Sequence, residues 1–419
     1  MEKSKLGKVI KKVYDKINSN DFLEVSKMNQ SDFTRNRKMS FPNLMVFIMS
    51  STKKSLQSAL FAFNSSFKFN SGTYTKQAFS KARKKINPSA FLAIFKESVE
   101  MFYKDGRYKR YKGYRVCAID GTRLNMPNSK EMAETYGFQN STNEQPQALV
   151  SCLYDVLNGI IIDAVIYPHN ANERKLAQLH LKELNRIRTS KELLIMDRGY
   201  PSAELIKNID DLNFKYVIRC SKEFIRNMKL KGNDCIVSHK FAKSVAVKLR
   251  VIKLRLDNGV EEILLTNIFS KNFEEKDFAE IYNMRWGIEE KYDDLKNKLE
   301  IENFSGTSNI AVLQEFYATM FLNNIASMMA MDCEEEIAER YKDKELKYQY
   351  KANISMTISI MKFSLIEMFL CKSQRERDKI LNNIYRQLLI SVTPIRPSRN
   401  FERTKKHKSQ KFPQNRRYL

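Results

Sequence analysis

Five short apolar segments between Tyr111 and Cys220 constrain the fold more than any other feature of this 419-residue chain. They are rich in β-branched and aromatic residues, which favour strands, and an Asn158-Gly159 turn joins the second to the third. A helical stretch precedes the fourth segment. Three strands followed by a strand-helix-strand unit predict a mixed α/β sheet. The predicted strands are 116–120, 147–157, 159–168, 193–197 and 214–220.

The first and fourth of these segments each end in an aspartate near a glycine. Asp120 follows VCAI and precedes Gly121, and Asp197 follows LLIM and precedes Arg198-Gly199. Buried strands of an α/β sheet present ligand-binding groups at their tips, so we expect the two carboxylates to meet at one edge. Taken singly, each aspartate fits better the ordinary role of a turn residue that ends a strand.

The segment Tyr282–Lys296, YNMRWGIEEKYDDLK, predicts a helix with a mixed polar face, because it has no proline and only one glycine. At about 100° per residue, Arg285 lies about 60° and Glu289 about 20° from Tyr282. Lys296 lies about 40° away on the same side. Alone, such a face is usually a solvated stripe of ion pairs.

The positive charge of the chain indicates a polyanionic partner. The net charge is +25 and the isoelectric point is about 9.6, and neutralisation of phosphates drives nucleic-acid binding. An anionic membrane surface is the competing partner, but no apolar run approaches the ~18 residues of a spanning helix. The N-terminus MEKSKLGKVIKKV lacks the apolar region of a signal peptide. We therefore expect a cytoplasmic protein that binds nucleic acid and no membrane.

Two other kinds of site are disfavoured. The six cysteines are scattered without a C-x-x-C pair and there are only four histidines, which argues against a zinc site. No G-x-x-x-x-G-K-[ST] loop occurs, so nothing supports nucleotide hydrolysis. His169 lies in a predicted turn, where a surface role is as good an interpretation as a chemical one.

Asp120, Asp197 and Glu289 together form an oxygen-only set of carboxylates. Such a set suits Mg²⁺ or Mn²⁺. Asp293 lies about 40° from Glu289 on the predicted helix and is an alternative third ligand. In a basic protein, the three carboxylates together favour a functional site over three separate structural roles.

Three motifs built on these residues resemble the catalytic motifs of the DDE transposases in the fourth large family of bacterial insertion sequences. They are Asp120-Gly121-Thr122, Asp197-Arg198-Gly199-Tyr200 and Tyr282-x2-Arg285-x3-Glu289-x6-Lys296. The last matches the family's Tyr-Arg-Glu-Lys signature at every position and spacing. The resemblance covers about 114–306. Asn172-Glu173-Arg174-Lys175 also resembles a family segment, but the resemblance assigns it no role here.

The resemblance implies an RNase H-like catalytic core, and the predicted strand order agrees with that fold. We assign the core to residues 111–220 and 271–305. The intervening 221–270 are assigned to an inserted β-subdomain, with a strand pair around the turn Asp257-Asn258-Gly259.

Family members with such an insertion use it against the transposon end, in some cases through a tryptophan that stacks on a flipped base. This chain departs from that pattern, because its only tryptophan is Trp286, inside the third motif. Whether Phe224, Phe241 or neither residue takes the stacking role is open.

Helical regions are predicted on both sides of the core. Residues 1–110 fit a helical DNA-binding domain of helix-turn-helix character, and the alternative is a plain helical domain with a solvated basic face. Residues 306–395 are predicted as packing helices, and 396–419 as a basic tail that either binds DNA or is merely solvated. The cations expected to contact DNA in the N-terminal region are Lys81, Arg83, Lys84 and Lys85.

The resemblance also implies a DNA transposase activity, in a protein associated with the bacterial nucleoid. The three carboxylates would hold two divalent ions that activate a water or a DNA 3′-hydroxyl for phosphoryl transfer. Hairpin formation at the transposon ends, strand transfer and a dimeric synaptic complex are implied as well. The alternatives are a nuclease that does not join DNA and a catalytically idle DNA-binding derivative. The residues expected to grip the DNA end are Tyr282, Arg285, Trp286 and Lys296.

Overall fold

The computed structural model divides the chain into two compact units, which are described separately. One consists of 1–105, 124–147 and 294–419, and the other of 106–123 and 148–293. The structure describes residues 4–35, 39–50, 53, 55–66, 74–139, 145–188, 190–240, 246–255, 261–342, 347–371 and 373–396.

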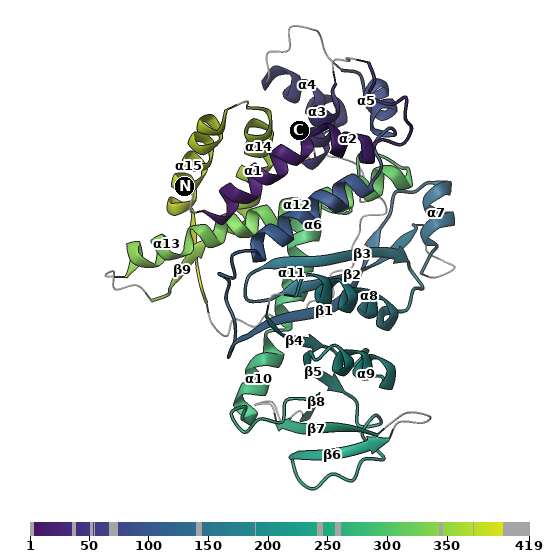
Figure 1. Cartoon of the computed structure of the whole chain (residues 1–419), viewed down its shortest axis with the longest axis vertical. Helices are drawn as coiled ribbons and strands as arrows, with labels where there is room; N and C mark the ends of the chain where they lie inside the picture. The colour runs from purple at the N-terminus through teal and green to yellow at the C-terminus, as the bar shows by residue number, and fades with distance from the viewer. Residues whose placement is uncertain are drawn as a thin grey trace. The chain divides into compact units, whose positions relative to one another are not determined.

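An eight-stranded mixed sheet is the framework of the second unit (Figure 1). Its order is β3-β2-β1-β4-β5-β8-β7-β6. The pairs β1·β4 and β4·β5 are parallel, whereas β2·β3, β5·β8, β7·β8 and β6·β7 are antiparallel. The five strands predicted before Cys220 all form, as β1 (Tyr114–Asn125), β2 (Gln147–Asp155), β3 (Ile160–Pro168), β4 (Lys191–Met196) and β5 (Lys215–Cys220).

The segment predicted as an inserted β-subdomain continues this same sheet. The strands β6 (Asp234–Lys240), β7 (Ala246–Arg255) and β8 (Glu261–Thr266) follow β5 in the chain, and β8 pairs directly with β5. The sheet therefore grows by three strands at the β5 edge. The predicted turn Asp257-Asn258-Gly259 lies outside the described residues.

Helices cover the sheet and close the unit. The helix α8 (Glu173–Arg186) packs on β3 and beside α9 (Ala203–Asp211), while α10 (Glu275–Asn283) contacts β5 and β7. The short α11 (Trp286–Asp293) follows α10. The Asn172 side chain caps α8 by accepting from two backbone N–H groups of its first turn, which is a favoured N-cap arrangement.

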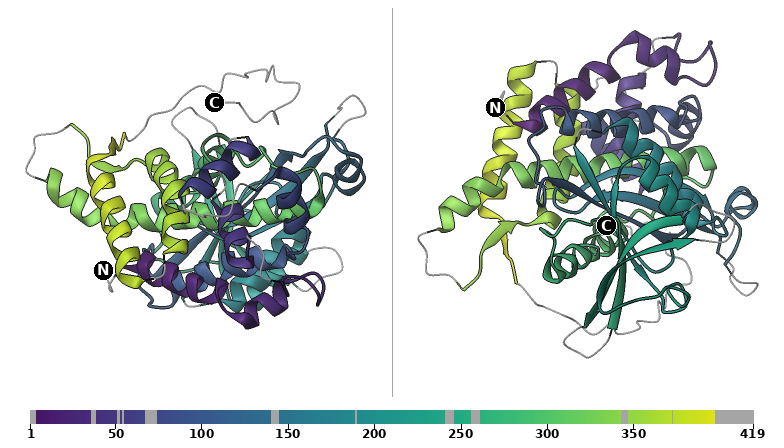
Figure 2. Two further views of the ribbon diagram at one scale, coloured as in Figure 1. Left: turned by 90° about the horizontal axis from the view of Figure 1, so that it is seen from above. Right: turned by 60° about the horizontal axis from the view of Figure 1, so that its bottom comes forward.

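The first unit is a helical bundle built around α12 (Asn309–Asp332), which is buried on nearly all sides. It packs against α1 (Lys5–Ile17), α3 (Phe41–Met49), α6 (Ser89–Tyr103) and α14 (Ile354–Leu370), and Figure 2 shows α14 beside α15 (Gln374–Ile390) in yellow-green. No helix in the described ranges has the length and apolar character to cross a bilayer. The remaining elements of this unit are α2 (Asn20–Ser26), α4 (Leu56–Ser66), α5 (Lys76–Arg83), α7 (Lys130–Tyr136), the π-helical turn η1 (Asp294–Lys298), α13 (Glu334–Tyr341), β9 (Tyr350–Ala352) and β10 (Val392–Pro394).

Candidate active site

Asp120 and Asp197 lie at the same level of two neighbouring parallel strands. Ala118 on β1 pairs with Ile195 on β4, and each aspartate stands two residues further along its strand direction. Asp197 directly follows β4, as predicted. Asp120 does not end its strand, because β1 runs on to Asn125; it marks instead the point where β1 passes from buried to partly exposed.

Each aspartate is fixed by the turn that follows it. The Gly121 N–H donates to Asp120 Oδ1 at 2.9 Å, and the Gly199 N–H donates to Asp197 Oδ1 at 2.8 Å. A backbone donor at one carboxylate oxygen restricts the rotation of the side chain. The two carboxylates are therefore held in defined directions.

The third motif is not one continuous helix. The helix α10 ends at Asn283 and α11 begins at Trp286, with Met284 and Arg285 between them. Hydrogen bonds tighten here to a three-residue spacing, from Arg285 N–H to the Tyr282 carbonyl at 3.0 Å and from Ile288 N–H to the Arg285 carbonyl at 3.1 Å. The prediction of a single helix was wrong at this junction.

Arg285 nevertheless contacts both Tyr282 and Glu289, as expected for three residues on one side of a helix. Its guanidinium donates to Glu289 at 2.8 Å and lies 5.5 Å from the centre of the Tyr282 ring. Tyr282 and Arg285 are buried, at 3% and 7% exposure, whereas Trp286 is 49% exposed and stacks near the guanidinium at 5.1 Å. Trp286 is therefore the accessible aromatic group of this motif.

Charge connects the three predicted carboxylates. Burial, together with the negative charges of Asp197 and Glu289, raises the pKa of Asp120 to about 6, against the opposing effects of the Gly121 N–H and Arg285. An ionised Asp120 is therefore disfavoured by desolvation and by its like-charged neighbours. Asp197 and Glu289 thus both act on Asp120.

The donor set fits a divalent cation in charge and in ligand type. Carboxylate oxygens are the preferred ligands of Mg²⁺ and Mn²⁺, and a cation would offset the repulsion around Asp120. Within the described ranges, no three Asp, Glu, His or Cys side chains are arranged to bind one ion as they stand. Glu289 is held by Arg285 instead.

A buried hydrogen-bond relay holds the backbone of Asp120. The Tyr292 hydroxyl donates to the Asp120 carbonyl at 2.6 Å, and the Ser151 hydroxyl donates to it at 3.3 Å. His180 bridges Ser151 and Asp163, with Nε2 3.0 Å from the serine oxygen and Nδ1 2.8 Å from the carboxylate. Satisfied buried polar networks rigidify their surroundings. The position of Asp120 is thus set by three strands and two helices.

Several of these residues were not predicted from the sequence. Ser151, His180 and Tyr292 are far apart along the chain and carry no motif that would connect them. Tyr200 belongs to the second motif, but its complete burial was not foreseen. Glu173 stands in the Asn172–Lys175 stretch, which had a family resemblance and no assigned role.

The two remaining candidates of the third motif are placed differently. Lys296 lies on η1, in the other unit, and is half-buried. Asp293 is the last residue of α11 and is exposed, whereas Glu289 lies in the first turn and is half-buried. Glu289 is therefore the better third carboxylate, since its charge acts on Asp120.

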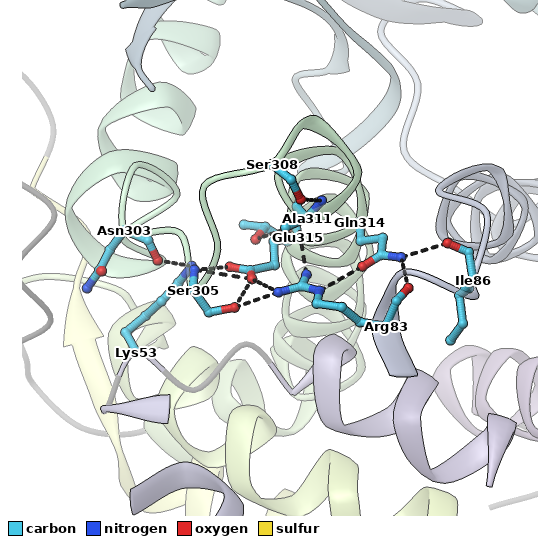
Figure 3. A network of polar contacts seen from close by, with 10 residues as sticks. Lys53, Arg83, Ile86, Asn303, Ser305, Ser308, Ala311, Gln314 and Glu315 are labelled. Atoms are coloured by element: carbon cyan, nitrogen blue, oxygen red, sulfur yellow. Dashed lines mark hydrogen bonds and ion pairs between the residues drawn. The ribbon is translucent and has the colours of Figure 1, made fainter. Parts of the chain in front are cut away.

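Arg83, predicted to contact DNA, is instead a structural residue of the helical unit. It is 4% exposed, and its guanidinium donates to Gln314 and Glu315, each at 3.0 Å (Figure 3). Ser305 and the Ala311 carbonyl accept further bonds, at 2.8 and 3.2 Å. A cation with its donors committed in this way cannot meet a phosphate, so the predicted role of Arg83 was wrong.

The other predicted cations differ among themselves. Lys81 and Lys84 are exposed, whereas Lys85 pairs with Asp32 at 2.9 Å. Phe224, a candidate for base stacking, is half-buried. Phe241 and tail residues 397–419 lie outside the described residues.

Comparison with known proteins gives one family match. The model of the transposase DDE domain matches residues 111–325, slightly more than half of the chain. No curated protein matches. Among solved structures, a piggyBac transposase synaptic complex with hairpin DNA aligns over 90% of this chain and 85% of its own, with 12% identity and a TM-score of 0.49.

Proposed function

The chain belongs to the transposase DDE domain family, and we propose that it mobilises a bacterial insertion sequence by binding its terminal inverted repeats and by cutting and joining DNA. In this proposal it is a member of the fourth large insertion-sequence family. The observation that carries the proposal is that Asp120 and Asp197 stand at the same level of two neighbouring parallel strands, where the charges of Asp197 and Glu289 both act on Asp120. Three carboxylates brought together against their own repulsion are typical of a catalytic site.

Asp120, Asp197 and Glu289 would hold Mg²⁺ or Mn²⁺, with two ions per site. The bound ions would supply Lewis-acid activation of a nucleophilic oxygen and charge stabilisation of a leaving oxygen. The role of the chain is to hold the carboxylates in place. The bonds from Gly121 and Gly199, together with the relay onto the Asp120 carbonyl, support that role.

The cationic and aromatic groups of the third motif would position the DNA end. Arg285 lies in the junction of α10 with α11 and donates to Glu289, so it is placed to neutralise charge next to the reacting phosphate. Trp286 offers an exposed ring for a nucleobase. Tyr282, which is buried beneath Arg285, would fix the guanidinium and not touch DNA itself. Lys296 is proposed as a further phosphate contact.

In this proposal each region of the chain has its own role. The strand order β3-β2-β1-β4-β5 supports an RNase H-like core over 111–220 and 271–305, with 221–270 as an insertion that enlarges its sheet. Residues 1–110 would bind DNA, 306–395 would be a supporting helical region, and 396–419 would be a basic tail. The working form would be a dimer in the bacterial nucleoid, with double-stranded DNA as its partner and hairpin ends as an intermediate.

The test uses the full-length protein with labelled DNA fragments that carry the inverted repeats flanking its gene. With Mg²⁺ we expect nicked, hairpin and joined products, resolved on denaturing gels. Hydrolysis without any joined product would favour the nuclease alternative. Binding of the repeats with no cleavage in Mg²⁺ or Mn²⁺ would overturn the proposal in favour of an idle derivative.

A further inference from the structure

Glu173 is a carboxylate next to the candidate active site that has no role in the arrangement described so far. It is the first residue of α8, directly after the Asn172 cap. The neighbouring Arg174 Nε donates at 2.9 Å to the carbonyl of Gly199, in the turn that holds Asp197. The start of α8 is therefore docked on the second aspartate motif.

The Glu173 carboxylate also lies against the first aspartate motif. A Cβ atom added to Gly121 would stand 3.2 Å from Glu173 Cδ and 3.3 Å from Oε1. These distances are shorter than ordinary van der Waals contact, so the space beside Gly121 is taken by this carboxylate. Gly121 directly follows Asp120, and Glu173 thus stands beside both aspartate turns.

The direction of Glu173 is set by the far part of its own helix. His180 follows Glu173 by seven residues, which is about two turns and places both on one face of α8. His180 is fully buried between Asp163 and Ser151, and Ser151 in turn donates to the Asp120 carbonyl. The same relay that holds Asp120 therefore also anchors the helix that carries Glu173.

The buried Tyr200 hydroxyl lies near the same carboxylates. Tyr200 is 0% exposed, and its hydroxyl lies close to the Glu173 carboxylate, although within the part of the chain that the structure describes it makes no hydrogen bond of strict geometry. Burial raises its pKa, and the charges of Asp120, Glu173 and Asp197 add to that effect. Burial likewise raises the pKa of Glu173, as does the charge of Asp197, against the opposing effects of Arg123 and the Tyr200 hydroxyl. Three carboxylates gathered around one buried hydroxyl leave an excess of negative charge that a bound cation would offset.

We infer that Glu173 is a fourth carboxylate of the active site, which binds a divalent cation together with Asp197. The four carboxylates then follow one another as neighbours in the order Glu289, Asp120, Asp197 and Glu173. Two cations held by four carboxylates are better neutralised than two cations held by three. This inference rests on the proposed function, because it assigns a further ligand to the same site.

The test is a titration of the full-length protein with Mn²⁺, followed by electron paramagnetic resonance of the free ion. Glu173→Gln is expected to weaken one of the two Mn²⁺ sites by about 10- to 100-fold. Glu204→Gln is the matched control, because Glu204 lies in the first turn of the adjacent α9 and bonds Gln178 at 2.9 Å. It removes the same helix-terminal charge and should leave both Mn²⁺ sites unchanged.

The outcomes separate the two proposals. Failure of the unaltered protein to bind Mn²⁺ would argue against the proposed function itself. Normal Mn²⁺ binding by Glu173→Gln, with a loss of thermal stability like that of Glu204→Gln, would overturn only the inference and leave Glu173 as a helix-terminal charge. If Glu173→Gln does not fold, Glu173→Asp keeps the carboxylate and shortens its reach, and it should weaken the same site.

Gly121→Ala provides an independent check. The added Cβ would push the Glu173 carboxylate aside, while the Gly121 N–H to Asp120 is kept. We expect it to weaken the same Mn²⁺ site as Glu173→Gln, and the double variant to be no weaker than Glu173→Gln alone. Additive losses in the double variant would show that Gly121 acts through Asp120 and would contradict the inference.

Discussion

Two clusters of partly or fully buried charge, one in each unit, contrast in how completely they are satisfied. Around Arg83 in the helical unit, the charge of the guanidinium is balanced by Glu315 and its donors are accepted by Gln314, Ser305 and Ala311. Around Asp120 in the sheet unit, like charges are gathered, and one cation, Arg285, and the Gly121 N–H oppose their effect on Asp120. The charges of the first cluster are balanced within the cluster, whereas the second cluster has an excess of negative charge.

The contrast shows how a charged residue can be assigned a role once its surroundings are known. A buried ion pair with every donor satisfied is a packing element, and it carries no spare capacity for a ligand. A carboxylate whose pKa is raised by burial and by like-charged neighbours, as Asp120 is, costs folding free energy when it is ionised, and such a cost is typical of functional sites. Both clusters contain residues that the sequence made candidates for DNA chemistry. Only the Asp120 cluster has the excess negative charge that binding of divalent cations needs.

The largest effect is expected from removing a carboxylate of the Asp120 cluster. Asp120→Asn or Asp197→Asn should lower cleavage of a labelled transposon end by roughly ten-thousandfold, as loss of a catalytic group typically does. Binding of the end should be nearly unchanged, because neither variant removes a phosphate-binding cation. Gel shifts and cleavage assays on the same protein samples measure the two quantities. Normal Mg²⁺-dependent cleavage by either variant would refute the assignment of the site.

The opposite pattern is expected at Arg83. Arg83→Met leaves Glu315 buried without its cation, so it should lower the free energy of unfolding by about 3–5 kcal/mol. Below its unfolding temperature, the variant should cleave DNA normally. Adding Glu315→Gln to Arg83→Met should restore much of the stability, and urea denaturation would measure both changes. Unchanged stability with a large loss of DNA affinity would mean that Arg83 is a DNA contact after all.

Arg285 separates positioning from chemistry within the third motif. Glu289→Gln should stop every cleavage step, since each would use the same carboxylates. Arg285→Ala should keep first-strand nicking but lose about 10- to 100-fold in the later steps, when a distorted DNA end must be held. Resolution of nicked, hairpin and joined products on a labelled end decides between them. Normal nicking by Glu289→Gln, with Arg285→Ala dead at the first step, would reverse the two roles.

The sequence predicted the local elements of the catalytic unit well. Each expected strand overlaps an observed one, because alternation and β-branched composition are local signals. The prediction failed where the third motif breaks between α10 and α11. Just after the break, a Cβ added to Gly287 in the first turn of α11 would stand 3.7 Å from Tyr154 and 3.8 Å from Val156, so α11 starts close to the end of β2. Helical periodicity contains no information about such a distant surface.

Long-range pairing accounts for the other failures. Arg83 looks like part of a basic helix face, and its partners Gln314 and Glu315 are more than two hundred residues away. His180 and Ser151 are likewise joined only by the packing of α8 on the sheet. The motif spacing could suggest that Asp120, Asp197 and Glu289 belong together. It could not reveal the groups that hold them.

A smaller effect should appear in the pH dependence of stability. The pKa of Asp120 rises from 3.8 to about 6 on folding, so between these values the folded state binds more protons than the unfolded state. The contribution of Asp120 to the free energy of unfolding therefore decreases as pH rises through this window. Asp120→Asn should lack that decrease when urea denaturation is followed from pH 4 to 7 without divalent cations. Identical pH profiles for the variant and the unaltered protein would show that neither burial nor the neighbouring charges raise the pKa of Asp120.

The smallest effects are expected from the exposed lysines near Arg83, and they test the contrast between satisfied and available charge within one short stretch. Lys81 and Lys84 are exposed, whereas Lys85 pairs with the buried Asp32. If the N-terminal region contacts DNA, Lys81→Ala or Lys84→Ala should weaken binding to all sequences alike and reduce the slope of log affinity against log salt by about 0.9. Lys85→Ala should change that slope less, because its charge is already neutralised by Asp32, and should instead lower stability. Salt titrations of DNA binding by the three variants provide the comparison. Equal slopes in all three and in the unaltered protein would show that this basic stretch is a solvated face and that the DNA contacts lie elsewhere.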